Sequence, residues 1–170
     1  MTIKYQILYR AYDKTQSAHK GKRPLGLTKT QISKVSFYSI YQAIQGMSYK
    51  FVIVGDDISQ ELLNFFSLFE DIIIDNDNLG SPSKSIQKQI DLALEVPDDE
   101  WVYMCEDDYL HTQFSFQYIS EFIENKERYL KTSPKKKNYM NRIIGDLSII
   151  PLIIHPSDYP DRYMPPWKRL

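Results

Sequence analysis

The chain is poor in cysteine, glycine and net charge. Its 170 residues include one cysteine and six glycines, and the formal net charge is −1. The lone cysteine, Cys105, excludes a disulfide within the chain and suits a reducing compartment. Its place in an apolar run predicts a core residue rather than a nucleophile. The balanced charge gives no general attraction for nucleic acid, so we expect no nucleic-acid partner.

Long apolar runs are also missing. No stretch approaches the roughly 20 apolar residues of a membrane-spanning helix, and residues 1–5 lack the apolar core of a signal peptide. These absences predict a cytoplasmic protein with no membrane span. A content of 42% hydrophobic and 25% charged residues is typical of soluble globular proteins. The length predicts a single domain, residues 1–170, with a sizeable core.

Four short apolar runs alternate with helical patterns along the chain. The runs lie at residues 5–9, 51–54, 71–75 and 101–105, and apolar residues at helical spacing follow each of them. This alternation is typical of strands joined by right-handed helical crossovers. It predicts an α/β fold, Rossmann-like, with a mostly parallel central sheet flanked by helices.

Two of the helices carry clear start signals. Thr28 and Gln31 have the form of a capping box, and Gly46 provides a stop for the same helix. Ser81 followed by Pro82 fits the N-cap and first position of the third helix. In that helix we expect an apolar stripe, formed by Ile86, Ile90, Ala93 and Leu94.

Charged residues cluster directly after three of the predicted strands. Arg10 and Asp13 follow the first, Asp56 and Asp57 the second, and Glu106, Asp107 and Asp108 the fourth. The carboxyl ends of parallel strands meet at one edge of the sheet, where ligands bind in α/β folds. We therefore expect these side chains to converge on one site.

The acidic triplet after the fourth strand suggests a metal. Side chains alternate along an extended chain, so Glu106 and Asp108 project to one side and Asp107 to the other. Two converging carboxylates repel each other unless a cation lies between them, and hard oxygen ligands suit Mn²⁺ or Mg²⁺. Lys84, in the first turn of the third helix, would add positive potential for a diphosphate. The alternatives are a solvated acidic turn and a solvated lysine.

The last part of the chain has a different pattern. A fourth helix is expected at residues 114–130, followed by a basic loop at residues 134–137. Residues 147–154 are strongly apolar but are interrupted by Pro151, which predicts an edge or bulged strand. The segment 155–163 is rich in proline and functional side chains and predicts either a wall of the site or a surface loop.

The order of elements, the aspartate after the second strand and the sequence Glu106-Asp107-Asp108-Tyr109 resemble glycosyltransferases of the GT-A fold, especially the family-2-like group. The triplet stands where that family has its DXD motif, here in an EDD form. The segment 158–163 is similar to an Asp-His-Pro-Asp-(Lys/Arg)-Tyr pattern of small family-2-like members, with Tyr159 in place of the histidine. The chain is shorter than most members, so we expect a short acceptor-binding part.

The resemblance implies a metal-dependent transferase that moves a sugar from a nucleoside diphosphate, with UDP expected, to a hydroxyl of a glycan or glycoprotein acceptor, with inversion. Asp108 would be the principal metal ligand, with Glu106 and His155 as further ligands. The nucleotide would be held by Tyr9, Arg10, Asp13, Asp56, Lys84 and Asp107. Asp158 and Asp161 are the candidates for the general base that takes the acceptor proton.

Two other classes stay open. A nucleotidyltransferase acting on a sugar phosphate shares the parallel sheet and the metal, but it usually has a Gly-rich basic loop after its first strand, and residues 10–13 contain no glycine. The second open class is a non-catalytic module that binds nucleotide or glycan. The presence of Glu106, Asp108 and Asp56 favours an enzyme over such a module. No pattern in the sequence indicates the sugar or the oligomeric state.

Overall fold

The computed structural model describes residues 3–14 and 24–125. The chain divides into two units, Met1–Gln117 and Tyr118–Leu170. Of the second unit, the described part is residues 118–125, which contain the end of helix α4 (Ser115–Glu124). The sheet and the other helices belong to the first unit.

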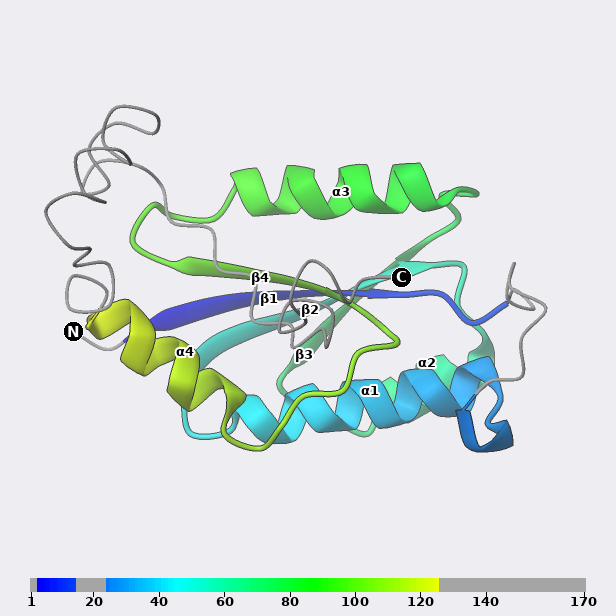
Figure 1. The fold of residues 1–170 in the computed structure, drawn as a ribbon. Coiled ribbons are helices and arrows are strands. Elements are labelled where there is room, and N and C mark those ends of the chain that lie inside the picture. The colour runs from blue at the N-terminus through cyan, green and yellow to red at the C-terminus, as the bar shows by residue number, and fades with distance from the viewer. Residues whose placement is uncertain (1–2, 15–23, 126–170) are drawn as a thin grey trace, which may run out of the picture. The chain divides into compact units, whose positions relative to one another are not determined.

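A four-stranded parallel sheet forms the centre of the first unit (Figure 1). Its strands are β1 (Lys4–Ala11), β2 (Ser48–Asp56), β3 (Ile72–Asp77) and β4 (Trp101–Glu106), in the spatial order β3-β2-β1-β4. Helices α1 (Lys29–Ile44) and α2 (Gln60–Phe66) lie on one face, and α3 (Pro82–Leu94) lies on the other. This arrangement confirms the predicted α/β, Rossmann-like fold.

The predicted helix signals are confirmed. The Gln31 amide donates to Thr28 Oγ1 (3.1 Å), and the Thr28 amide donates to Gln31 Oε1 (2.8 Å), which completes the capping box of α1. Gly46, just after α1, has a φ of 82°, a conformation that glycine adopts without strain. Ser81 caps α3, and Pro82 is its first residue. Among the helices of the described residues, none is long and apolar enough to cross a membrane.

Aromatic side chains fill the layer between the sheet and helices α1 and α2. Tyr9, Phe37, Phe51 and Phe66 are completely buried. The Phe37 ring centroid lies 5.8 Å from that of Tyr9, 5.4 Å from that of Phe51 and 4.9 Å from that of Phe66. Buried aromatic rings remove a large apolar area from water and gain from edge-to-face contacts, so this cluster is a main source of stability.

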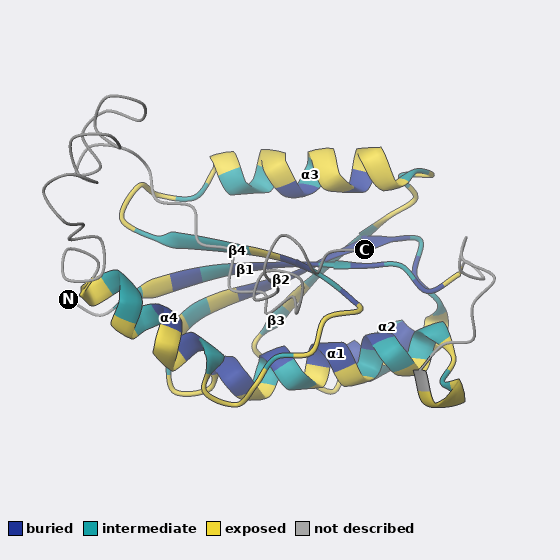
Figure 2. Cartoon of the chain, in the orientation of Figure 1, coloured by how far each residue is buried: buried dark blue, intermediate teal, exposed yellow. Residues whose placement is uncertain are grey.

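Helix α3 turns a different face to the sheet than its sequence predicts. The expected stripe is wrong for Ile86, Ile90 and Leu94, which are exposed, whereas Ala93 does pack against the core. Figure 2 shows that the side of α3 away from the sheet is largely exposed. The residues of α3 that are fully buried are polar. They are Ser85 and Gln89.

Hydrogen bonds to the sheet explain this orientation of α3. The Gln89 side-chain amide donates to the backbone carbonyls of Leu8 (2.6 Å) and Cys105 (3.2 Å), so a buried polar group is satisfied inside the layer. On another side of α3, Lys88 Nζ forms ion pairs with Asp75 (2.5 Å) and Asp77 (2.7 Å) of β3. These polar contacts fix the rotation of the helix about its axis. With this rotation, most of the predicted apolar stripe is exposed to solvent.

One helix covers only part of this face of the sheet. Ile73, Val52, Leu8 and Met104 stand opposite one another in register across the four strands. Val52 and Leu8 in the middle are 7% and 1% exposed, whereas Ile73 and Met104 at the flanks are 48% and 43% exposed. Side chains in register point to the same face, so α3 shields β1 and β2 and leaves the apolar flanks open to solvent.

Cys105 lies in β4 as a core residue, which confirms its prediction. Its side chain is buried, and burial raises the pKa of the thiol, because the thiolate is costly to form away from water. The charges of Asp107 and Glu106 raise that pKa further. The thiol is therefore unreactive in the folded protein.

Gly55 near the end of β2 sits against Asn76 of β3. A methyl group at Gly55 would lie 2.5 Å from Asn76 Oδ1, which accepts a hydrogen bond from the Ile58 amide (3.0 Å). We expect Gly55→Ala to lower the free energy of unfolding by about 2 kcal/mol, because the methyl group must displace this side chain. Urea unfolding measures the loss, and the same substitution in an Asn76→Ala background should cost less. An unchanged urea midpoint for Gly55→Ala would contradict this packing.

Candidate functional site

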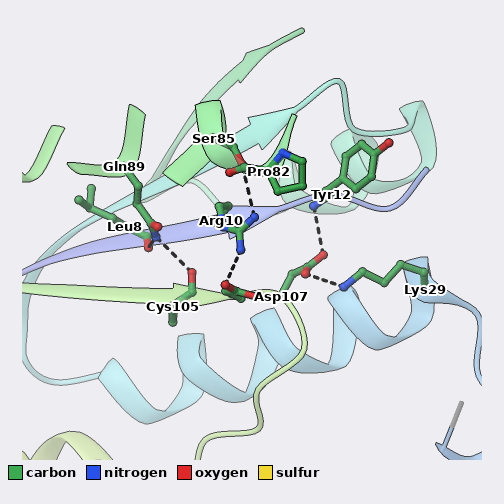
Figure 3. A network of polar contacts seen from close by, with 10 residues as sticks. Leu8, Arg10, Tyr12, Lys29, Pro82, Ser85, Gln89, Cys105 and Asp107 are labelled. Atoms are coloured by element: carbon green, nitrogen blue, oxygen red, sulfur yellow. Dashed lines mark hydrogen bonds and ion pairs between the residues drawn. The ribbon is translucent and has the colours of Figure 1, made fainter. Parts of the chain in front are cut away.

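The acidic residues after β4 enter different environments. Glu106 is the last residue of the strand, and the chain turns at Asp107 and Asp108. Glu106 pairs with Arg10 on the α3 side of the sheet, and Asp107 pairs with Lys29 of α1 on the other (Figure 3). These two neighbours therefore point to opposite faces, as their alternation predicts.

Asp107 holds three parts of the fold together. Its side chain is 8% exposed, and its Oδ1 binds Lys29 Nζ at 2.6 Å. Its Oδ2 accepts hydrogen bonds from the Ser33 hydroxyl (2.6 Å) and the Tyr12 backbone amide (3.1 Å). Both oxygens are thus bound to protein donors, so Asp107 joins β4 to α1 and to the chain after β1. The structure gives it a positioning role rather than a free ligand group.

Lys29 and Ser33 were not found by sequence reasoning. Lys29 is the first residue of α1, where the positive end of the helix dipole disfavours a cation. A lysine at that position signals a carboxylate partner elsewhere in the fold. Ser33 lies one turn later on the same side of the helix. The four-residue spacing of Lys29 and Ser33 was therefore the available signal that the two side chains can bind one partner.

Arg10 lies between β4 and helix α3 (Figure 3). Its side chain is 14% exposed, its Nη2 forms an ion pair with Glu106, and its Nη1 donates to the Ser85 hydroxyl (3.3 Å). The Nε of Arg10 is buried and has no hydrogen-bond partner among the described residues. The guanidinium therefore has an unused donor.

Asp108 differs from its two neighbours because it forms no ion pair within the described residues. Asp108 is an exposed residue, and partial desolvation raises the pKa of its carboxyl; Lys29 acts against this increase, and the charges of Asp107 and Glu106 add to it. The ionised form is thus less favourable here than in water, and a nearby divalent cation would relieve the repulsion. Asp108 and Glu106 carry the hard oxygen donors that such a cation prefers.

A cation at this edge would need further ligands. Residues 3–14 and 24–125 contain no group of three or more His, Cys, Asp or Glu placed to bind a metal. Mg²⁺ and Mn²⁺ commonly keep waters and take oxygens from substrate phosphates, so a pair of carboxylates is a sufficient protein contribution.

Tyr9 and Asp13 are built into the fold. Tyr9 is completely buried, its hydroxyl donates to the Ser33 carbonyl (3.1 Å), and burial raises its pKa. Asp13 is 9% exposed and accepts hydrogen bonds from the Ser59 amide (2.9 Å) and the Thr30 hydroxyl (3.0 Å). The structure places Tyr9 in the core and uses Asp13 to join the chain after β1 to the starts of α1 and α2, so neither presents a free group to a nucleotide.

Asp56 organises the loop that precedes α3. Its Oδ1 accepts hydrogen bonds from the backbone amides of Leu79 (2.8 Å) and Gly80 (3.0 Å), and its side chain is largely buried. Lys84, in the first turn of α3, is exposed. Asp57 pairs with Lys14 (2.6 Å) at the same edge. These groups all lie at the carboxyl edge, where each follows the end of a strand or starts α3, and several of them serve the fold.

A hollow of about 310 Å³ lies on the α3 side of the sheet, towards the amino ends of β1 and β2. Its walls include Gln6, Lys50, Leu92, Glu95 and Glu100. The acidic triplet and Arg10 do not line it. The hollow and the acidic edge are therefore separate features of this unit.

Three predicted site residues, His155, Asp158 and Asp161, lie outside the described residues. The same holds for the predicted strand at residues 147–154, the loops at 134–137 and 155–163, and the end of the helix predicted at 114–130. The described start of that helix is α4. The part of the site that the structure describes is therefore the edge formed by β1, β2, β4 and α3.

Comparisons of the chain with protein-family models, curated proteins and solved structures gave no match.

Proposed function

We propose that this chain is a metal-dependent glycosyltransferase with a GT-A-like fold. It moves a sugar from a nucleoside diphosphate, with UDP as the first candidate, to an acceptor hydroxyl of a glycan or glycoprotein. The observation that carries the proposal is the environment of Asp108. It is an exposed carboxylate without an ion pair in the described residues, two positions after Glu106 at the carboxyl edge of a parallel sheet, the edge where ligands bind in α/β folds.

The neighbouring groups support a diphosphate ligand. Glu106 and Asp108 would hold the cation, whose charge offsets that of the diphosphate leaving group. Arg10 supplies a fixed positive charge close to Glu106. The N-terminus of α3, with Lys84 in its first turn, adds positive potential, and Asp56 fixes the loop that leads into it. Asp158 and Asp161 remain the candidates for the general base.

Asp108→Asn is the variant that tests the metal assignment. For the parent protein, the melting temperature should rise with UDP or GDP when Mn²⁺ is present and not when it is absent, because a ligand bound by the folded state raises stability by mass action. In Asp108→Asn the metal-dependent affinity should fall by more than about tenfold, since one of two charged ligands is lost.

Asp57→Asn is the matched control, because it removes a carboxylate that pairs with Lys14 at the same edge. It should keep most of the metal-dependent affinity, and an equal loss in both variants would mean a general charge effect. If no nucleoside diphosphate raises the melting temperature of the parent in Mn²⁺, the proposal fails. Release of a nucleoside diphosphate from the matching sugar donor then distinguishes glycosyl transfer from nucleotidyl transfer, which releases pyrophosphate.

A further inference from the structure

The guanidinium of Arg10 is fixed on one side and meets an exposed partner on the other. Ser85, which binds Nη1, is 2% exposed, and its hydroxyl also donates to the Pro82 carbonyl (3.0 Å). Glu106, which binds Nη2, has a side chain that is 46% exposed, against 14% for Arg10. The arginine is therefore held in place by α3, whereas Glu106 can leave it at little cost in packing.

The free donor of Arg10 lies on the side that Glu106 occupies. Nε and Nη2 share one edge of a guanidinium, the edge that binds two oxygens of a carboxylate or phosphate at once. Here Nη2 is paired with Glu106 Oε1, and Nε is buried with no partner among the described residues. Glu106 thus uses this edge incompletely.

We propose that the Nε–Nη2 edge of Arg10 is an oxyanion site, which Glu106 occupies in the ligand-free protein and which a phosphoryl group takes when it binds. The inference rests on the proposed function in naming the substrate diphosphate as the source of that group. Displacement would free the Glu106 carboxylate, which could then serve as a ligand for a cation at this edge. Metal and diphosphate then favour each other's binding, and the coupling is reciprocal.

Glu106→Gln tests this competition, because it removes the charge and keeps the shape of the side chain. In buffer with EDTA and no divalent metal, we expect inorganic pyrophosphate to bind Glu106→Gln about tenfold more tightly than it binds the parent. Isothermal titration at fixed ionic strength measures this ratio. A residue that acted as a metal ligand alone would give no gain without metal.

Two further variants make the result specific. Glu100→Gln removes the same charge at the opposite end of the same two strands, where Glu100 lies 3.8 Å from Lys4, and it should leave the affinity for pyrophosphate unchanged. Arg10→Lys in the Glu106→Gln background keeps the positive charge and removes the two-nitrogen edge, so it should abolish the gain. If Glu106→Gln does not fold, Glu106→Asp is the substitute, because its shorter side chain holds the carboxylate farther from Arg10. It should also bind pyrophosphate more tightly than the parent, but by a smaller factor.

The outcomes separate this inference from the proposed function. Equal affinity of the parent and Glu106→Gln for pyrophosphate overturns the oxyanion site, as does an equal gain in Glu100→Gln. If the parent still binds UDP with Mn²⁺ in that case, the proposed function stands without it. If pyrophosphate binds Glu106→Gln more tightly while no nucleotide binds the parent with metal, the oxyanion site stands and the transferase proposal fails.

Discussion

Asp107→Ala should be far less stable than Asp108→Ala, although the two residues are neighbours. The loss of Asp107 leaves the Lys29 ammonium, 19% exposed, without its counter-ion. It also removes the acceptor of the Ser33 hydroxyl and of the Tyr12 amide. Breaking a buried ion pair from one side costs about 3–5 kcal/mol, and we expect a loss of that size in the free energy of unfolding.

Asp108→Ala is the matched control for this prediction. Burial and the neighbouring carboxylates raise the pKa of Asp108, so its ionised form is less favourable in the folded than in the unfolded chain. Without metal at pH 7, this variant should be at least as stable as the parent. Urea unfolding in EDTA measures both variants, and equal losses would contradict the separate roles of the two aspartates.

Acidification should destabilise the protein through His111. Burial lowers the pKa of this imidazole from the ordinary 6.5 to about 4. Its Nε2 lies 2.8 Å from the Tyr103 hydroxyl, and its Nδ1 is buried with no hydrogen-bond partner in the described ranges. The unfolded chain takes up a proton near the ordinary pKa, whereas the folded protein resists it. This contribution is therefore complete above pH 6.5 and declines as the pH falls, by up to about 3 kcal/mol at pH 4.

His111→Phe isolates this effect from the titration of carboxylates. The variant keeps a ring next to Tyr103 and Phe116, whose centroids lie 5.7 Å and 6.4 Å from that of His111. Between pH 7 and pH 4 the parent should lose about 3 kcal/mol more of its free energy of unfolding than the variant loses. Urea unfolding at a series of pH values measures the two slopes. Parallel slopes would show that the imidazole is not buried in its neutral form.

Most of the fold could be predicted because its signals are local. Each apolar run became a strand of the sheet, and the caps at Thr28 and Ser81 start helices where they were expected. The rotation of α3 could not be predicted in the same way. Ser85 and Gln89 face the sheet because the carbonyls of Leu8 and Cys105 accept the Gln89 amide, and that contact joins residues far apart in the sequence.

The candidate site shows the same division. That Arg10 and Glu106 meet follows from parallel strands that end at one edge, and the two residues are in register. The different roles of Asp107 and Asp108 do not follow from the sequence, since both are aspartates in one turn. Their roles depend on Lys29 and Ser33 of α1, whose side chains bind Asp107 directly.

The buried thiol of Cys105 is a built-in probe for local opening of β4. An alkylating reagent can modify this side chain only when β4 separates from its neighbours, because the folded state hides the sulfur and keeps it protonated. The rate of alkylation therefore measures how often the strand that ends in Glu106 opens. A ligand bound at the end of that strand slows this rate by the factor by which it stabilises the closed state. Since the chain has one cysteine, the signal needs no engineered label.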